Sequence, residues 1–380
     1  MKITAFLIYT LSFFIFCFNS CIKKEDNKKN NIIYVNLAKV DKVSLWDIFS
    51  HIELIPLETN EQSLIKQVSK IIPYDDNYYV LDYRKSEILM FDSNGKYLHK
   101  ISDRGEGPQE YANISDFEID EVNNNLSVLA PVNYSMYEYD FKGNFLNKYK
   151  LPDIIGAYMS FISLNKDTIV YFTYDYDNRI KLYSKSKNRI VKELLPENEN
   201  LLNKFSYNVF PYANYLHRAA SNTLFKVEDK GEIIDGYTWD FGKLNNSSSQ
   251  LRNIKKIPYN DLPQHFSQFI NSEIINQVII LHGGNSQYLF SQIWRKGKHV
   301  NIFHDKKNNK NYLFERTIEN ATFHPLSWHE DYVIGFYSDE WGERKETIPD
   351  AILNDKNTKI INQWNEYDNP ILIKYYFKKQ

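Results

Sequence analysis

Two stretches of the chain, residues 79–98 and 127–146, share one pattern of apolar and polar positions at an offset of 48 residues. Each stretch starts with an apolar run, continues through alternating apolar and polar positions, and reaches an Asp-x-x-Gly segment before a final strand-like segment. Upstream positions keep the offset, since Ile71 falls on Ile119. Asp at the start and Gly at the end of a short polar segment are typical of hairpin turns, so the repeat predicts strands joined by tight turns.

Each repeating unit is interpreted as four short antiparallel strands in roughly 40–50 residues, the size of one β-propeller blade. Turns are predicted at Asp92–Gly95 and Asp140–Gly143. Strands are predicted at Ser69–Pro73, Tyr78–Asp82, Ile88–Phe91 and Tyr97–Ile101 in the first unit, and at Asp116–Asp120, Leu126–Ala130, Met136–Tyr139 and Phe145–Lys150 in the second.

The pattern weakens further along the chain. Residues 222–235 repeat a third strand, a turn and a fourth strand, with Gly231 in the glycine position. Residues 261–278 differ, because their apolar positions follow helical spacing and predict a short inserted helix. Other strands are predicted at Thr168–Phe172, Ile180–Tyr183, Arg189–Leu194, Val300–Phe303, Tyr312–Glu315, Tyr332–Tyr337 and Ile371–Phe377.

The number of units and the pairing of the chain ends follow from this pattern. About 330 residues at roughly 50 per blade fit six or seven blades. A closed ring leaves no unpaired edge, so an N-terminal strand should complete the sheet that contains Ile371–Phe377. The two segments that could do so are Ile32–Leu37 and Ile52–Leu57.

The first residues of the chain predict export. After Lys2, the run Ile3–Phe18 is almost wholly apolar, and its length suits a signal-peptide core rather than the roughly 20 residues of a spanning helix. Asn19, Ser20 and Cys21 follow, and then a polar segment. A small residue directly before a cysteine, at the end of an apolar run, resembles the signal of bacterial lipoproteins.

That resemblance implies a signal peptide over residues 1–20, a diacylated Cys21 and a flexible tether over residues 21–31 that attaches the protein to a membrane. Phe18 and Asn19 depart from the commoner Leu and small residue of the signal. An uncleaved membrane anchor and plain secretion are the alternatives. Because Cys17 would leave with the signal peptide, the remaining domain would have no free thiol for a disulfide, a zinc site or a nucleophile.

Composition narrows the class of protein. The formal net charge is −2 and charges of both signs are scattered, so nucleic acid is not expected as a partner. The chain has 29 Tyr, 24 Phe and 6 Trp, and such an aromatic content favours sheet. We expect an all-β domain that acts as a monomer and needs no cofactor or metal.

Four segments in order resemble a family of six-bladed, NHL-like β-propeller lipoproteins of Bacteroidetes. They are IELIPLET (Ile52–Thr59), YYVLDYRKSEILMFDSNGKYLHKIS, DRGEGPQEY (Asp103–Tyr111) and the closing DNPILIKYYFK (Asp368–Lys378). The resemblance implies a six-bladed propeller of four-stranded antiparallel blades over residues 32–380. Lys24, Glu25 and Asp26 lie where such lipoproteins carry an acidic signal for surface display, so the expected location is the outer membrane of the cell envelope, exposed at the surface. The family implies no settled activity.

The DRGEGPQEY segment contains the best candidates for ligand binding. Arg104 could clamp a carboxylate or phosphate, Glu110 could accept hydrogen bonds, and Tyr111 could stack on a sugar or base. The alternative is a rigid crossover between two blades, with Arg104 paired to Glu106 or Glu110. Trp341, in a polar segment, could serve as a platform for a glycan.

The sequence gives little support for a metal site or a catalytic motif. The nearest histidine pairs are His299 with His304 and His324 with His329, and five-residue spacing points such pairs to opposite faces of a strand. Asp175 and Asp177 lack the spacing of a calcium loop. No hydrolase or nucleotide-binding motif occurs. The sequence therefore favours a module that binds a glycan, a peptide or an envelope protein, and the alternative is a metal-dependent lyase or lactonase-like hydrolase at the mouth of the propeller channel.

Overall fold

The two repeats fold as two antiparallel four-stranded sheets in chain order. Every strand predicted for these units is present, and its bounds differ from the prediction by at most one residue. The first sheet comprises β3 (Val68–Tyr74), β4 (Asn77–Asp82), β5 (Glu87–Asp92) and β6 (Tyr97–Ile101), and the second comprises β7 (Asp116–Asp120), β8 (Asn125–Ala130), β9 (Ser135–Tyr139) and β10 (Phe145–Lys150).

The predicted Asp-x-x-Gly turns are confirmed. The carboxylate of Asp92 accepts hydrogen bonds from the backbone N–H groups of Asn94 and Lys96, at 2.8 and 2.9 Å. Gly95 and Gly143 have φ angles of +84° and +81°, which residues with a Cβ rarely adopt. A Cβ on Gly95 would also lie 2.1 Å from the carbonyl oxygen of Pro56, so this glycine allows two neighbouring sheets to approach closely.

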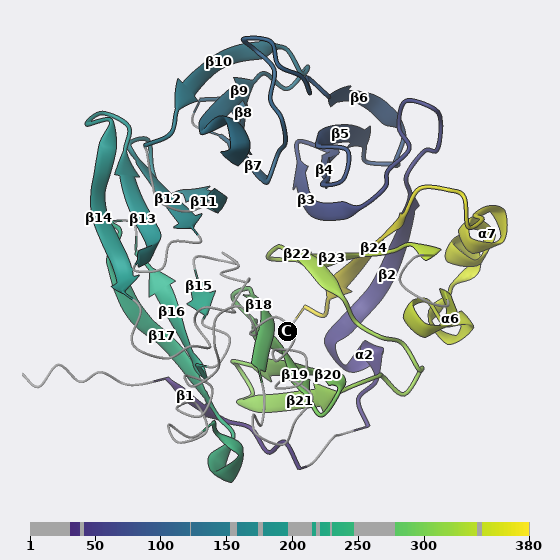
Figure 1. Ribbon diagram of the computed structural model, residues 1–380. Coiled ribbons are helices and arrows are strands. Elements are labelled where there is room, and N and C mark those ends of the chain that lie inside the picture. Colours follow the sequence, from purple (N-terminus) through teal and green to yellow (C-terminus); the bar gives the residue numbers. More distant parts are fainter. Residues whose placement is uncertain are drawn as a thin grey trace, which may run out of the picture. The chain divides into compact units, whose positions relative to one another are not determined.

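Four further sheets complete a six-bladed β-propeller, shown in Figure 1. The structure is a computed structural model that describes residues 31–38, 42–121, 123–152, 158–173, 178–196, 215–217, 221–228, 230–246, 278–339 and 344–379. The third blade contains β11 (Tyr158–Ser163), β12 (Thr168–Thr173), β13 (Asn178–Ser184) and β14 (Arg189–Pro196), and the fourth contains β15 (Tyr215–His217), β16 (Thr223–Val227) and β17 (Ile233–Asp240) with β1 (Ile32–Tyr34). The fifth blade contains β18 (Val278–Gly284), β19 (Tyr288–Arg295), β20 (Lys298–Asp305) and β21 (Lys310–Phe314). The sixth contains β22 (Pro325–Trp328), β23 (Tyr332–Tyr337) and β24 (Ile371–Phe377) with β2 (Phe49–Pro56).

The N-terminal segment contributes strands to two blades. β2 pairs antiparallel with β24, so of the two predicted closures Ile52–Leu57 is right. The other segment, Ile32–Leu37, instead supplies β1, which pairs parallel with β17 in a different sheet. Between these strands the chain buries Val43 and Leu45 among aromatic residues of the last two blades. The N-terminal segment therefore ties the fourth, fifth and sixth blades together.

The described helices are short. They are α2 (Leu45–Ile48), α6 (Arg344–Thr347) and α7 (Asp355–Gln363), with 3-10 turns at Pro131–Asn133, Gly242–Leu244 and Asp350–Ile352. α7 begins at Asn354, whose side chain accepts a hydrogen bond from the backbone N–H of Asn357. Residues 261–277 of the predicted inserted helix lie outside the described residues, and Val278 is the first residue of β18.

The second and third strands of a blade are buried on both faces. Tyr79 and Leu81 of β4 pack towards the next blade, in a cluster with Phe117 and Val128. The alternate residues of β4 pack the other way, in a cluster with Ile334 and Leu372 of the last blade. Because both faces are covered, these strands are continuous apolar runs, and each buried large side chain adds about 1.5–3 kcal/mol of burial free energy.

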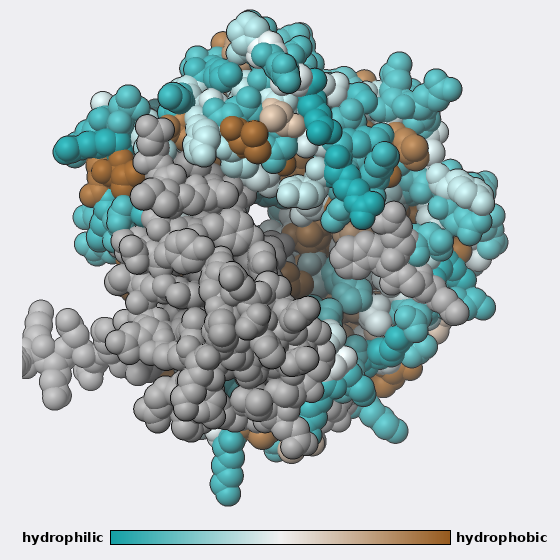
Figure 2. Space-filling model, viewed as in Figure 1, coloured by the Kyte–Doolittle hydropathy of each residue, from teal (hydrophilic) through white to brown (hydrophobic). Residues whose placement is uncertain are grey.

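The surface carries single hydrophobic side chains rather than one patch in the view of Figure 2, where the described residues are mostly hydrophilic. Among the described residues, no helix combines the length and apolar character needed to cross a membrane.

Candidate functional site

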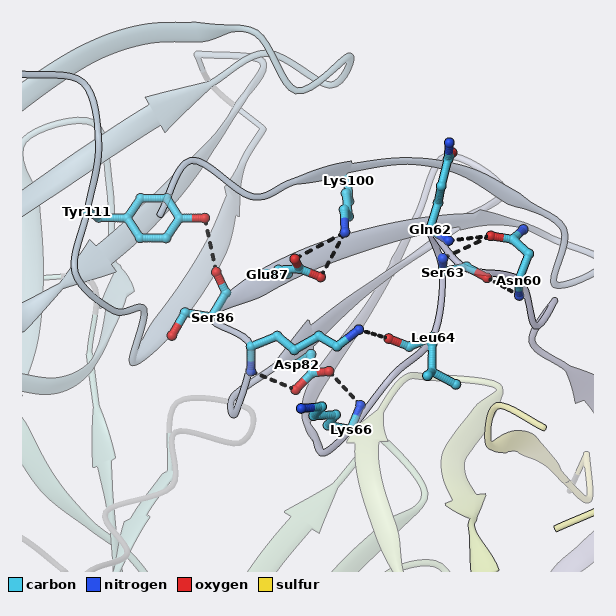
Figure 3. Close-up of polar contacts among 11 residues, drawn as sticks. Asn60, Gln62, Ser63, Leu64, Lys66, Asp82, Ser86, Glu87, Lys100 and Tyr111 are labelled. Carbon is cyan, nitrogen blue, oxygen red and sulfur yellow. Dashed lines mark hydrogen bonds and ion pairs between the residues drawn. The ribbon is translucent and has the colours of Figure 1, made fainter. Parts of the chain in front are cut away.

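The DRGEGPQEY loop is a crossover between the first two blades, and its tyrosine is structural. Tyr111 has no exposed surface, and its hydroxyl donates to the carbonyl oxygen of Ser86 at 3.0 Å (Figure 3). Its ring packs edge-on against Tyr137, which donates from its own hydroxyl to the carbonyl oxygen of Glu110. In this position the ring has no face for a ligand, so stacking by Tyr111 is not supported.

The two glycines of the loop make room for Glu110. The Glu110 carboxylate accepts a hydrogen bond from the backbone N–H of Gly107 at 2.7 Å. A Cβ on Gly105 would lie 1.9 Å from the same carboxylate. Arg104 forms a backbone bridge with Tyr111, and the Arg104 and Glu110 side chains are exposed. The geometry favours the rigid crossover, and ligand binding by Arg104 and Glu110 stays a prediction. Trp341 lies outside the described residues.

Asp82, in the second landmark segment, is also structural. It is fully buried, and its carboxylate accepts a hydrogen bond from the backbone N–H of Lys66 at 2.6 Å (Figure 3). It also accepts hydrogen bonds from the backbone N–H groups of Gln67 and Lys85, both at 3.2 Å. These bonds tie the segment before β3 to the turn between β4 and β5. Asp82 therefore stabilises the local structure of the first blade.

A cavity lies instead between the fifth blade and the segment that leads from it to the sixth. It has a volume of about 600 Å³, within the range of small-molecule sites. Trp294 and His299 approach it from either side of the turn between β19 and β20, and His324 enters from the segment just before β22. The remaining lining residues are Gln292, Gly297, Lys298, Asn301, Glu315, Arg316, Thr322 and Phe323. We call this site the Trp294 cavity.

Strand direction places the Trp294 cavity at one end of the ring. Directions alternate within a blade, so the turn after the second strand and the crossover after the fourth strand lie at the same end. The β19–β20 turn follows the second strand of its blade. The segment from β21 to β22 and the DRGEGPQEY loop each follow the fourth strand of a blade. The cavity and the loop therefore share an end of the propeller but lie at different blades.

The structure pairs histidines that the sequence did not pair. His299, from the fifth blade, and His324, from the segment just before β22, have ring centroids 6.1 Å apart. His304 instead contacts Asn311 and His329 contacts Ser327, so neither pair close in sequence comes together. Burial lowers the pKa of His299, and burial with the nearby charges of His299 and Arg316 lowers the pKa of His324 to about 4. Both rings are neutral at pH 7.

The charged groups at the rim of the Trp294 cavity are paired. Lys298 forms an ion pair with Glu315 at 2.6 Å, and Arg316 forms one with Glu346 of α6 at 2.9 Å. These side chains are at least one-third exposed, so each pair adds little stability. The pairs cancel the charge around the cavity, since two cations meet two carboxylates.

A second cavity of about 300 Å³ lies at the opposite end of the fifth and sixth blades, lined by the turns after β18 and β22. Next to it, Ser327 Oγ lies 2.8 Å from His329 Nε2, a distance that suits a nucleophile and its base. However, burial and the Lys374 charge lower the pKa of His329 to about 4. Such an imidazole is a weak base at neutral pH, so this pair is better explained as a structural hydrogen bond.

The inner strands of the first two blades share an ion cluster. Lys70 of β3 contacts Asp116 and Glu118 of β7, with its Nζ 2.9 and 2.6 Å from their carboxylate oxygens. Burial raises the pKa of Glu118, and the two carboxylates raise the pKa of Lys70. Lys70 therefore stays charged and links neighbouring inner strands. Among the residues that the structure describes, no group of three or more His, Cys, Asp or Glu side chains is placed to hold a metal ion.

Comparison with known proteins identifies relatives of the same architecture. The model of a family described as a domain of unknown function (DUF4934) matches residues 30–376. A protein from Bacteroides fragilis that is described as exported has 16% identity and a TM-score of 0.71, with 92% of this chain and 99% of that chain covered.

A second solved structure, a member of the DUF4221 family from Bacteroides vulgatus, has 12% identity and a TM-score of 0.53, with 90% and 99% of the two chains covered. No curated protein matches the sequence significantly. At these identities the solved structures establish the fold alone.

Proposed function

The chain belongs to the family described as a domain of unknown function, DUF4934, and from that starting point we propose that it is an exported, lipid-anchored propeller that binds a ligand in the Trp294 cavity. The observation that carries the proposal is the cavity itself. It joins a half-buried aromatic side chain, two neutral histidines and hydrogen-bonding groups where the segment from β21 to β22 lies against the fifth blade. Such a mixture of apolar surface and a few oriented polar groups is typical of binding sites.

The anchored location is supported by the sequence before the propeller. A short apolar run ending in Ser20-Cys21 precedes a polar segment, and the similar B. fragilis protein is described as exported. Acylated Cys21 would hold the propeller at the cell envelope through the tether, leaving its loops open to ligand. Display at the outer surface is part of the proposal and is supported by Glu25 and Asp26 after the cysteine.

Fractionation of cells tests the anchor. Cys21→Ser should release the protein from the membrane fraction or leave the unprocessed precursor, because no thiol remains to be acylated at that site. Cys17→Ser is the matched control and should behave as wild type, since Cys17 leaves with the signal peptide. A Cys21→Ser protein that has the processed mass and stays in the membrane fraction would contradict the anchor.

Thiol protection tests the cavity. Thr322→Cys places one reactive thiol in the lining, and Asn147→Cys places one on an exposed strand far from it in the sequence. The full chain, extracted in detergent, is treated with methyl methanethiosulfonate in the presence of oligosaccharide and peptide libraries. A bound component should slow modification of Thr322→Cys and leave Asn147→Cys unchanged. Equal rates with and without every library component would contradict binding in the cavity.

A further inference from the structure

The ligand class can be narrowed from the side chains of the Trp294 cavity, and this step rests on the binding function proposed above. Charge is the first criterion. Lys298 and Arg316 are each already paired with a carboxylate, at 2.6 and 2.9 Å. An anionic ligand would have to displace Glu315 or Glu346, or lie beside them and be repelled. The rim therefore favours a ligand without net charge.

The interior of the cavity also favours a ligand without net charge. His299 and His324 are half-buried neighbours, and burial holds the pKa of each below its ordinary value. Each neutral imidazole has one donor and one acceptor nitrogen. Gln292 and Asn301, bonded to each other at 2.9 Å, add fixed amide groups to the floor. A ligand that offers both donors and acceptors, such as a hydroxyl group, matches these partners.

Trp294 supplies an aromatic surface. Its ring lies at the cavity edge-on to His299, with centroids 4.8 Å apart. Its Nε1 is buried and has no hydrogen-bond partner in the part of the chain that the structure describes, so protein atoms separate this N–H group from a ligand. The indole ring is therefore the part of Trp294 that a ligand can contact.

We propose that the Trp294 cavity binds a neutral saccharide, with an apolar sugar face against the Trp294 ring and a hydroxyl group on His299. A sugar presents both features at once: C–H groups on one face of the ring and hydroxyl groups around its edge. The volume of about 600 Å³ suits a short oligosaccharide rather than a single small ion.

Isothermal titration of the detergent-extracted full chain tests the saccharide class. The probes are maltotriose, cellotriose, xylotriose, mannotriose and diacetylchitobiose, and the comparison probes are inorganic phosphate, trigalacturonate and trialanine. At least one neutral saccharide should bind saturably at millimolar concentration or below. Trp294→Ala should weaken that binding about tenfold or more, and Trp294→Phe should weaken it less, because it keeps an aromatic face and loses only the N–H donor.

Trp46→Phe is the matched control. Trp46 lies on α2, outside the cavity lining, so this variant should bind the saccharide as wild type does. If only phosphate, trigalacturonate or trialanine binds, and Trp294→Ala abolishes it, the cavity is a binding site but the saccharide class is wrong. If no neutral saccharide binds, the inference fails. If binding occurs and is insensitive to Trp294→Ala, the proposed binding function of the cavity fails with it.

Discussion

Asn369 shows how one buried side chain can hold a ring of sheets closed. It is 1% exposed, and its amide donates to the carbonyl oxygens of Glu58 and Ser63, at 2.7 and 2.8 Å. Its carbonyl accepts from the backbone N–H of Ile65 at 2.8 Å. These contacts join the segment after β2 to the start of β24. They explain why the two landmark segments that contain Glu58 and Asn369 occur together in one sequence.

Replacing Asn369 should therefore destabilise the protein strongly. Asn369→Ala removes the hydrogen bonds to the backbone groups of Glu58, Ser63 and Ile65, and we expect a loss of about 3 kcal/mol in the free energy of unfolding. Asn369→Asp keeps the shape but sets a carboxylate oxygen against two carbonyl oxygens, so it should destabilise at least as much. Urea unfolding monitored by tryptophan fluorescence measures both. Asn147→Ala, at an exposed position, should stay within about 0.5 kcal/mol of wild type.

The stability of the protein should depend on pH through single buried histidines. Burial lowers the pKa of His324 and of His329 to about 4, and in the unfolded chain both return to about 6.5. The unfolded state therefore binds more protons between these values, so stability is fully present above pH 6.5 and falls as the pH falls towards 4. Each histidine contributes about 3 kcal/mol over that whole range.

In the window from pH 6.5 to 5, carboxylates with ordinary or lowered pKa stay ionised, and other groups with shifted pKa, such as His299 and Glu118, are present in both proteins compared. Urea midpoints for the His324→Gln/His329→Gln variant should vary less with pH in this window than those of wild type. Parallel pH profiles for the two proteins would contradict neutral burial of these histidines.

At the scale of elements, the sequence predicts some strands better than others for a physical reason. Central strands such as β4 and β8 are buried on both faces and are flanked by local turn signals, so composition identifies them. The inner strand β22 has four residues and begins with Pro325, which gives no such signal. α7 was not predicted either, although Asn354 at its N-terminus and the apolar pair Ile360-Ile361 were available signals.

The N-terminal segment is the element whose place could not be predicted from its pattern. Both Ile32–Leu37 and Ile52–Leu57 suited the last blade, and only tertiary packing decides between them. Val35 and Leu37, each 3% exposed, pack with Trp239 and with residues of the fifth blade. This packing favours the parallel pairing of β1 with β17.

Removing these two side chains tests the role of the segment. Val35→Ala/Leu37→Ala should lower the free energy of unfolding by about 4 kcal/mol, because both leave cavities between blades. Ile32→Ala/Tyr34→Ala changes the exposed face of the same strand and should have a small effect. Equal losses in the two double variants, measured by urea unfolding, would mean that β1 does not pack as described.

For the whole molecule, the repeat predicted the ring, whereas the site depended on contacts that no local pattern records. A unit of about four dozen residues with its turns predicted six or seven sheets, the family resemblance implied six, and the structure has six. The Trp294 cavity joins the β19–β20 turn to His324 just before β22, so its members become neighbours only when the segment from β21 to β22 folds against the fifth blade. The most distinctive segment, DRGEGPQEY, drew attention to a loop whose buried tyrosine and paired glutamate serve the crossover.

The crystal structure of the protein with its tightest-binding saccharide would test the central claim most directly. The account predicts ligand density in the Trp294 cavity, with a sugar face on the Trp294 ring and an oxygen within hydrogen-bond distance of a His299 ring nitrogen. Ligand density elsewhere on the propeller, with the cavity holding only solvent, would contradict it.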